Sequence, residues 1–415
     1  MPSNNLDMRF LKKTLVILFA FMSVTVKSQD TITVMSYNIL NYPVSNPTKA
    51  DTLKSIIQYI QPDIFMITEL TSSSGATTIL NDALNVDGVT YYQKSNYVNG
   101  PDTDNLLYYN SDKLVLYSQF EISTTLRNIS EYVLHYNSPG MTSSSDTVFI
   151  YCYMAHLKAS SGIANEQQRN QEAVALKNYM DSRTNIENVI LGGDFNLYTS
   201  SEPAHNTILN GGSVLLLDPI STPGNWNNNV VFSGVHTQST RSGSLPDGGA
   251  FGGMDDRFDF IFFTSDLLTG SNKLTYVPNS YTAIGNDGNH FNKSINATPA
   301  NTSAPANVIE ALYNMSDHLP ISIKAYLPMN VGIISYGFSP DWEGYFSEGV
   351  FNFKSEKSEK ELSIFVYNLL GKLIIKKSYR NKREFKFQVN NIKPGLYIVR
   401  VVSKLKQKSF RIIKN

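Results

Sequence analysis

The stretch Leu191-Gly192-Gly193-Asp194-Phe195-Asn196 places a carboxylate and a carboxamide at the end of a short apolar run that reads as a buried strand. Because side chains alternate along a strand, Asp194 and Asn196 share one side of it. The two glycines leave room there for another backbone or for a ligand. This pattern is typical of a phosphate or metal site, and it equally suits a strand that closes with an ordinary Asx turn.

Other polar residues lie at the ends of apolar strands or inside them along the chain. They are Asn38, Glu69, His156, Asp259, Asp317 and His318. Each has an ordinary structural interpretation alone; a histidine at a strand end, for example, is more often a hydrogen-bonded structural residue than a catalyst. Together with Asp194 and Asn196 they match the needs of phosphate-ester hydrolysis. Oxygen ligands hold a hard divalent cation, which activates water and polarises the phosphoryl oxygen. A carboxylate takes the proton, and a histidine oriented by a second carboxylate stabilises the developing charge.

The surrounding pattern predicts the elements that must position these residues. Residues 31–39 alternate as a strand, helical spacing follows over residues 50–60, Pro62 ends that helix, and residues 64–69 form a second strand. This strand–helix–strand order predicts a layered α/β domain. Further segments are predicted as a helix at 77–84, strands at 105–109, 113–117, 131–136 and 147–157, a helix at 165–179, and strands at 257–263 and 321–327.

Six motifs resemble, in order, those of the endonuclease/exonuclease/phosphatase superfamily over residues about 30–328. They are Tyr37-Asn38, Thr68-Glu69, His156-Leu157-Lys158, Gly193-Asp194-Phe195-Asn196, Arg257-Phe258-Asp259-Phe260 and Ser316-Asp317-His318-Leu319-Pro320. The resemblance implies an α+β fold, a four-layer α/β/β/α sandwich of two mixed sheets flanked by helices, with the site at one rim. It also implies a divalent ion, Mg²⁺ or Mn²⁺ with Ca²⁺ as a further candidate. Glu69 would be the main metal ligand, with Asn38 and Asp317 near the metal.

The same resemblance implies roles for the remaining residues. Asp194 would activate the attacking water and Asn196 would hold the phosphate. His318, oriented by Asp259, and His156 would contact the scissile phosphate. The sequence shows no carboxylate partner for His156, and the basic and aromatic substrate contacts of the nucleases have no clear match between the second and third motifs.

Charge divides the chain. Residues 30–330 carry a net charge of −13 and residues 331–415 a net charge of +10, although the whole chain is neutral. The acidic middle lacks the basic surplus of proteins that bind DNA through many phosphate contacts, so a polyanionic substrate would depend on a local site with bound cations. The single cysteine, Cys152, excludes an internal disulfide and is expected to be buried and inert.

Both ends of the chain carry export signals. Residues 1–28 have the charged start, short apolar run and small residue of a signal peptide, without a membrane span or a cysteine for a lipid anchor. Residues 329–348 are predicted as a linker. Residues 349–415 are predicted to form a small all-β sandwich with strands at 362–367, 372–375, 385–389, 396–402 and 409–413. This tail resembles the C-terminal sorting domain of the type nine secretion system, which implies that the protein is secreted or held at the cell surface.

The sequence leaves three functions open. The first is a secreted metal-dependent endonuclease on DNA or RNA, expected to be a monomer that meets the secretion machinery through its tail. The second is a secreted phosphodiesterase or phosphatase on phospholipids or sugar phosphates, for which Trp226 and Phe232 are candidate membrane contacts. The third is a non-catalytic surface adhesin, which the retained site residues argue against. The loop residues Asp287, Asn289 and His290 are expected to be loop hydrogen-bonders rather than ligands.

Overall fold

The computed structural model describes residues 30–136, 147–327, 337–338, 342–347, 349–368, 372–389, 392–404 and 406–414. The chain divides into two compact units, residues 1–329 and residues 330–415. The predicted signal peptide, residues 1–28, lies outside the described residues.

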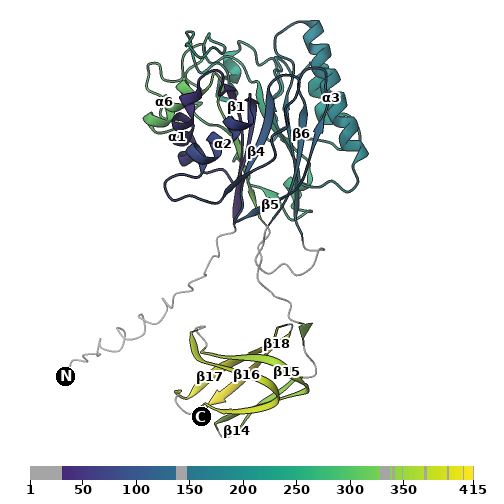
Figure 1. The fold of residues 1–415 in the computed structure, drawn as a ribbon, viewed down its shortest axis with the longest axis vertical. Coiled ribbons are helices and arrows are strands. Elements are labelled where there is room, and N and C mark those ends of the chain that lie inside the picture. The colour runs from purple at the N-terminus through teal and green to yellow at the C-terminus, as the bar shows by residue number, and fades with distance from the viewer. Residues whose placement is uncertain are drawn as a thin grey trace, which may run out of the picture. The chain divides into compact units, whose positions relative to one another are not determined.

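The N-terminal unit is built on two mixed sheets (Figure 1). The first has the order β10-β12-β1-β2-β4-β3, with β11 paired to β12, and the second has the order β5-β6-β7-β8-β9. The strands of the first sheet are β1 (Thr31–Tyr42), β2 (Ile64–Leu70), β3 (Tyr92–Lys94), β4 (Asp104–Asn110), β10 (Thr275–Tyr276), β11 (Thr282–Ala283) and β12 (Ile321–Tyr326). Those of the second are β5 (Leu114–Ile122), β6 (Ile129–Tyr136), β7 (Phe149–His156), β8 (Val189–Asp194) and β9 (Asp259–Phe263).

Three apolar clusters hold four layers together. One cluster joins the two sheets and includes Val34 from β1 and Ile150 from β7. The other two join each sheet to its helices, so that helices cover the outer face of both sheets (Figure 1). The first sheet is covered by α1 (Ala50–Ile60), α2 (Ser73–Thr78), the π-helix η2 (Ile79–Leu84) and α6 (Ala306–Met315). The second is covered by α3 (Ile163–Ser182) and α4 (Pro203–Asn210). The four-layer sandwich expected from the sequence is confirmed.

The connecting segments contribute three further short helices. They are η1 (Pro47–Lys49), η4 (Val230–Val235) and α5 (Asp266–Thr269). Among the described residues, no helix is both long enough and apolar enough to cross a membrane.

The two glycines of the opening motif lie where other parts of the chain approach closely. A Cβ on Gly193, whose φ is +152°, would lie 1.8 Å from the carbonyl oxygen of Ala155 on β7. A Cβ on Gly192 would lie 2.7 Å from Met66 of the facing sheet. Close approach of another backbone, one of the two uses expected from the sequence, is supported at Gly193, whereas the close neighbours of Gly192 are side chains. Cys152 is buried between the sheets, as expected, and burial raises the pKa of its thiol.

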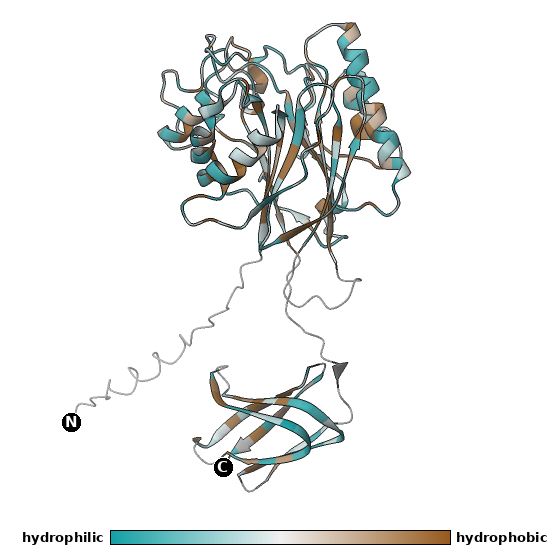
Figure 2. Ribbon diagram, in the orientation of Figure 1, coloured by the Kyte–Doolittle hydropathy of each residue, from teal (hydrophilic) through white to brown (hydrophobic). Residues whose placement is uncertain are grey.

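The C-terminal unit is all-β, as expected, with one curled six-stranded sheet. Its strands are β13 (Gly337–Phe338), β14 (Trp342–Ser347), β15 (Val350–Asn368), β16 (Leu373–Gln388), β17 (Gly395–Val402) and β18 (Lys406–Lys414). One half of β15 pairs with β14 and the other half with β17, on either side of a register shift between Lys354 and Glu359. Hydrophobic and hydrophilic stretches both occur along these strands (Figure 2), and burial alternates along β17, where Tyr397, Val399 and Val401 are buried.

Two details of this unit differ from the sequence expectation. Residues 372–375 and 385–389, predicted as separate strands, belong largely to the single strand β16, whose basic middle stays paired with β15 while its side chains face solvent. Strands β13 and β14 fall within residues 329–348, the predicted linker, and Trp342 of β14 lies in the core of the unit.

Candidate active site

Strand register explains why residues far apart in the sequence meet at one end of the two sheets. In the second sheet His156 is paired with Asp194 on the parallel strand β8, and Asp194 is paired with Asp259 on the antiparallel strand β9. In the first sheet Asn38 is level with Thr68, the residue before Glu69. The amino end of β12 lies at the same end of this sheet. Asp317 and His318 belong to the motif that directly precedes this strand.

These polar residues at the ends of the two sheets form one cluster. At its centre Asn38 links a residue of each sheet, Glu69 and Asp194. Its Nδ2 donates to Glu69 Oε1 at 2.9 Å and to Asp194 Oδ2 at 3.1 Å, while its Oδ1 accepts the backbone N–H of Leu40 at 3.0 Å. The backbone N–H of Asn41 holds the other oxygen of Glu69 at 2.9 Å. One amide therefore fixes two carboxylates from different sheets beside each other.

Glu69 occupies the left-handed region of the backbone, with φ at +62°, where β2 loses its regular pairing with both neighbours. A residue with a side chain is held there only when its surroundings compensate for the strain, and such positions concentrate at functional sites. The hydrogen bonds that Glu69 accepts from Asn38 and Asn41 provide this compensation.

Two histidines lie beside the same carboxylate oxygen of Asp194. The Nε2 atoms of His156 and His318 lie 3.4 Å and 3.6 Å from Asp194 Oδ2. His318 Nδ1 is hydrogen-bonded to Asp259 Oδ2 at 2.7 Å, which fixes the ring. His156 Nδ1 has no hydrogen-bond partner among the described residues and lies 3.9 Å from Glu69 Oε1. The carboxylates nearest to His156 are thus those of the site itself.

The environments of these two histidines favour opposite charge states. Burial lowers the pKa of His156 well below its usual value, and the nearby Arg127 lowers it further. Burial also acts to lower the pKa of His318, but the charges of Asp259, Asp194 and Asp317 outweigh it and raise the pKa well above its usual value. Histidines with separated pKa values can serve different roles in one reaction.

One oxygen of the Asp194 carboxylate takes part in an Asx turn with Asn196, and the other lies among the clustered polar residues. The backbone N–H of Asn196 donates to Asp194 Oδ1 at 3.1 Å, which is an Asx turn. The other carboxylate oxygen of Asp194 faces the site, as the distances to the histidines show. Asn196 Nδ2 donates to the carbonyl oxygen of Leu157 at 3.3 Å, so its side chain lies beside the strand that carries His156.

Asp317 enters the cluster through a residue that the sequence did not single out. Gln238 Nε2 donates to Asp317 Oδ2 at 3.2 Å and lies 2.6 Å from His318 Nε2. The backbone N–H of Ala250 donates to the same oxygen of Asp317 at 2.7 Å, whereas Asp317 Oδ1 is buried and has no partner in the part of the chain that the structure describes. Gln238 lies in a Gly/Ser/Asn-rich segment without alternation, and no local signal in the sequence identifies it.

The donor set fits a hard divalent cation. Glu69, His156 and Asp194 offer ligand atoms within 4.8 Å of one another, and the orphaned Oδ1 of Asp317 is a buried acceptor without a donor. Burial raises the pKa of Glu69, and the charge of Asp317 raises it further. Burial likewise raises the pKa of Asp194 to about 7. A cation would relieve this crowding of acids, because positive charge favours their ionised forms.

Other residues highlighted by the sequence lie elsewhere. Trp226 is buried and packs with Phe260 at 5.3 Å between ring centroids, so it cannot contact a membrane. Phe232 is only half-buried and packs against the apolar cluster that contains Trp226 and Phe260. His290 is hydrogen-bonded to Asp287 at 2.8 Å and to two backbone carbonyls, which is the structural role expected for that loop.

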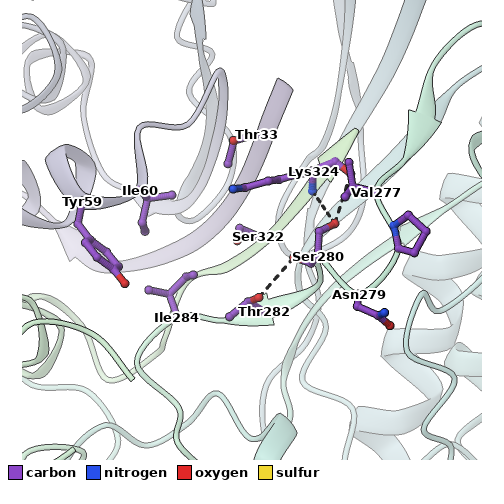
Figure 3. Close-up of a pocket in the computed structure, with 11 residues that line it drawn as sticks. Thr33, Tyr59, Ile60, Val277, Asn279, Ser280, Thr282, Ile284, Ser322 and Lys324 are labelled. Carbon is purple, nitrogen blue, oxygen red and sulfur yellow. Dashed lines mark hydrogen bonds between the residues drawn. The ribbon is translucent and has the colours of Figure 1, made fainter. Parts of the chain in front are cut away.

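Two pockets flank the first sheet. A pocket of about 480 Å³ adjoins the cluster, where Asn41 and Gly249 contribute to its wall. A second pocket of about 520 Å³ contains Thr33, Tyr59 and Lys324 in its lining, with no carboxylate among the lining residues (Figure 3). Thr33 precedes Asn38 on β1 and lies toward the other end of that strand, so this second pocket is not part of the cluster.

Two protein-family profiles match this chain. The profile of the endonuclease/exonuclease/phosphatase family matches residues 35–318, and that of the secretion system C-terminal sorting domain matches residues 347–415. None of the curated proteins matches the chain.

Similar solved structures share little sequence with this chain. TDP2 from D. rerio, complexed with a single strand DNA product, has 15% identity and a TM-score of 0.46, with 72% of this chain and 99% of that chain covered. The human Nocturnin catalytic domain has 16% identity and a TM-score of 0.44, with 72% and 97% covered. Staphylococcus aureus beta toxin has 14% identity and a TM-score of 0.40, with 71% and 99% covered. By its family matches, the chain belongs to the endonuclease/exonuclease/phosphatase family and ends in a secretion system sorting domain.

Proposed function

We propose that this protein is an exported, divalent-metal-dependent phosphodiesterase that cleaves nucleic acid. The observation that carries the proposal is the convergence of the polar residues from both sheets on Asp194, with Asn38 joined to two carboxylates at 2.9 Å and 3.1 Å. Charged groups are costly to bury unless they are paired or hold a metal, so a buried cluster of acids and histidines favours a catalytic site.

In the proposed mechanism Glu69 is the main metal ligand and Asp317 lies near the metal, while Asn38 orients Glu69. Bound there, the cation would polarise the phosphoryl oxygen and lower the pKa of water. Asp194 accepts the proton of the attacking water, and the pKa of about 7 that burial gives its carboxyl suits proton transfer near neutral pH.

The remaining residues act on the phosphate. His318 is held as a cation by Asp259 and stabilises negative charge that develops on the phosphoryl oxygens. His156 is neutral and contacts the same group by hydrogen bonding. Asn196 holds the phosphate from the second sheet, where its backbone is fixed by Asp194 at 3.1 Å.

Export would use both ends of the chain. Residues 1–28 act as the signal peptide for the inner membrane, and the sorting domain directs the protein to the type nine machinery. The sorting domain supports secretion or a cell-surface location. N-terminal sequencing of the exported protein should begin near Gln29, and a start at Met1 would contradict the signal peptide.

The decisive experiment uses the purified full chain without residues 1–28, treated with EDTA and then supplied with Mg²⁺ or Mn²⁺. Plasmid DNA, RNA, sphingomyelin and bis-p-nitrophenyl phosphate serve as substrates. We expect cleavage of DNA or RNA that requires the added ion. Turnover of the lipid without cleavage of either nucleic acid would favour the phospholipid alternative, and turnover that persists in EDTA would contradict the proposed metal site.

A further inference from the structure

Phe251 is an exposed aromatic residue directly beside the site. Its side chain is 62% exposed, and it follows Ala250, whose backbone N–H donates to Asp317 Oδ2 at 2.7 Å. The proposed mechanism gives this ring no role. An exposed large apolar side chain is ordinary when it stands alone on a surface, so its position and its support must decide whether it has a function.

The backbone on both sides of this ring is fixed. The N–H groups of Gly252 and Gly253 donate to the carbonyl oxygen of Arg241 at 3.0 Å and 2.9 Å, and Arg241 Nη1 donates to the carbonyl oxygen of Gly248 at 3.1 Å. Arg241 itself is fully buried. Phe251 is therefore held by a rigid loop and exposed to solvent, an arrangement that loses little conformational entropy when a ligand binds.

The loop that carries Phe251 is open to solvent at two of its glycines. A Cβ placed on Gly248 or Gly252 would meet no atom within 4 Å, so neighbouring side chains do not cover the loop there. The φ of Gly252 is +132°, which residues with a side chain rarely adopt, so the geometry of the loop depends on glycine at this position. Among the described residues, Phe251 has no ring contact of the kind that buries Phe260 against Trp226.

The adjoining pocket of about 480 Å³ has no free cation to offer. Its lining includes Gly248 and Gly249 of the same loop and, among the described residues, no lysine or arginine. The carboxylates in its wall are already paired, Asp102 with Arg127 at 2.9 Å and Asp247 with Arg241 at 2.9 Å. A second phosphate would find no partner here, whereas an uncharged part of the substrate would fit.

We propose that Phe251 is a specificity-determining residue whose ring stacks on an unpaired base of the substrate, next to the scissile phosphate. The inference rests on the proposed nuclease function and deepens it, because it assigns a preference for unpaired or unstacked bases. Base–aromatic stacking tolerates any sequence, since every base has a π-face. A membrane surface is a poorer match, because membrane binding uses basic residues beside the apolar ones, and no lysine or arginine lines the adjoining pocket among the described residues.

The test separates binding from turnover. Binding is measured with the catalytically impaired variant Asp194→Asn in Mg²⁺, by fluorescence anisotropy of a labelled single-stranded oligonucleotide and of a matched oligonucleotide with abasic tetrahydrofuran sites. Adding Phe251→Ala should raise Kd for the ordinary oligonucleotide by about ten-fold, within the range that base stacking contributes. Kd for the abasic oligonucleotide should not change, and Phe251→Tyr should restore binding.

The matched control is Leu268→Ala, because Leu268 is 53% exposed on α5, which follows the far end of β9. An equal Kd for Phe251→Ala and the parent variant on the ordinary oligonucleotide would overturn the inference, as would an equal loss on the abasic one. Loss of binding to sphingomyelin vesicles instead would assign the ring to a membrane. Turnover by the enzyme that keeps Asp194 tests the proposed function separately. If this enzyme cleaves no nucleic acid but Phe251→Ala still weakens binding to the ordinary oligonucleotide alone, only the proposed function is refuted.

Discussion

The two units of the chain treat polar side chains in opposite ways. The N-terminal unit buries acids and histidines at one end of its sheets, where Asp194, Asp259 and His318 are each at most 2% exposed. In the described part of the C-terminal unit the one buried polar residue is Ser355, and the core consists of aromatic and aliphatic side chains. Buried charge is unfavourable for stability unless it is compensated, so its concentration in one unit indicates where function lies.

The N-terminal unit also contains buried charges whose role is structural. Arg257 is fully buried, and its two terminal nitrogens each lie 2.9 Å from a carboxylate oxygen of Asp218. Such a bidentate pair neutralises the charge of both partners, whereas the acids around Asp194 lack a matching number of cations. The difference separates a pair that holds the fold from the cluster that we propose binds an ion and a phosphate.

The largest expected effect is the loss of turnover in Asp194→Asn. General acid–base catalysis contributes about 10²–10⁴-fold, so cleavage should fall by roughly 10³-fold. Stability should change little, because burial already disfavours the charged form of Asp194. The comparison variant Asp218→Asn should instead lose roughly 3–5 kcal/mol of stability, since it leaves Arg257 buried without its counter-charge. Turnover and thermal midpoints of both variants check this, and large destabilisation in Asp194→Asn would identify Asp194 as a core residue.

A core substitution in the C-terminal unit should affect stability alone. Phe353 is 2% exposed and stacks on Phe385 with 4.7 Å between ring centroids. Phe353→Ala should destabilise this unit by about 3–5 kcal/mol. Denaturant unfolding of the full chain should show one transition moved to lower concentration, with kcat/KM unchanged. A parallel loss of turnover would mean that the two units do not act independently.

A smaller effect is expected for Gln238, which contacts both Asp317 and His318. Residues that orient metal ligands typically contribute about 10–100-fold to activity or metal affinity, so Gln238→Ala should lower kcat/KM by about that factor. Titration with Mn²⁺ should show weakened binding as well. Asn289→Ala, a change in an amide on an exposed loop, is the control and should leave both quantities unchanged. Equal behaviour of the two variants would remove Gln238 from the site.

The smallest effect is the pH dependence of ion binding. Burial raises the pKa of Asp194 to about 7, so below this pH protons compete with the cation, and the affinity for Mg²⁺ should rise as pH increases from 6 to 8. The folded ion-free protein binds more protons than the unfolded chain here, so its own stability falls over the same interval. At a fixed Mg²⁺ concentration a hundred-fold above the Kd at pH 8, the ion should raise Tm by roughly 5 °C at pH 8 and by less at pH 6. A Tm shift that is equal at pH 6 and pH 8 would contradict this.

Local patterns in the sequence identified the longer strands of the N-terminal unit and the eight polar residues proposed for the site, but not Gln238. The alternation that ends at Asn38, Glu69 and Asp194 is a property of single strands, and the helical spacing of residues 50–60 is equally local. The order of the motifs then indicated the family. Local patterns also made Trp226 a candidate membrane contact, which is wrong because this side chain is buried. A tryptophan in a polar loop gives no sign that Arg257 and Phe260 will pack against it.

The sequence by itself determined which side chains can perform the chemistry and at which strand ends they lie. Only the tertiary structure decided that Gln238 bridges Asp317 and His318, that Glu69 lies in a left-handed backbone conformation, and that Phe251 is held beside the site in solvent. The physical reason is that strand and helix patterns depend on near neighbours. The meeting of distant loops depends instead on sheet register and on the packing of whole layers, which no short stretch of sequence encodes.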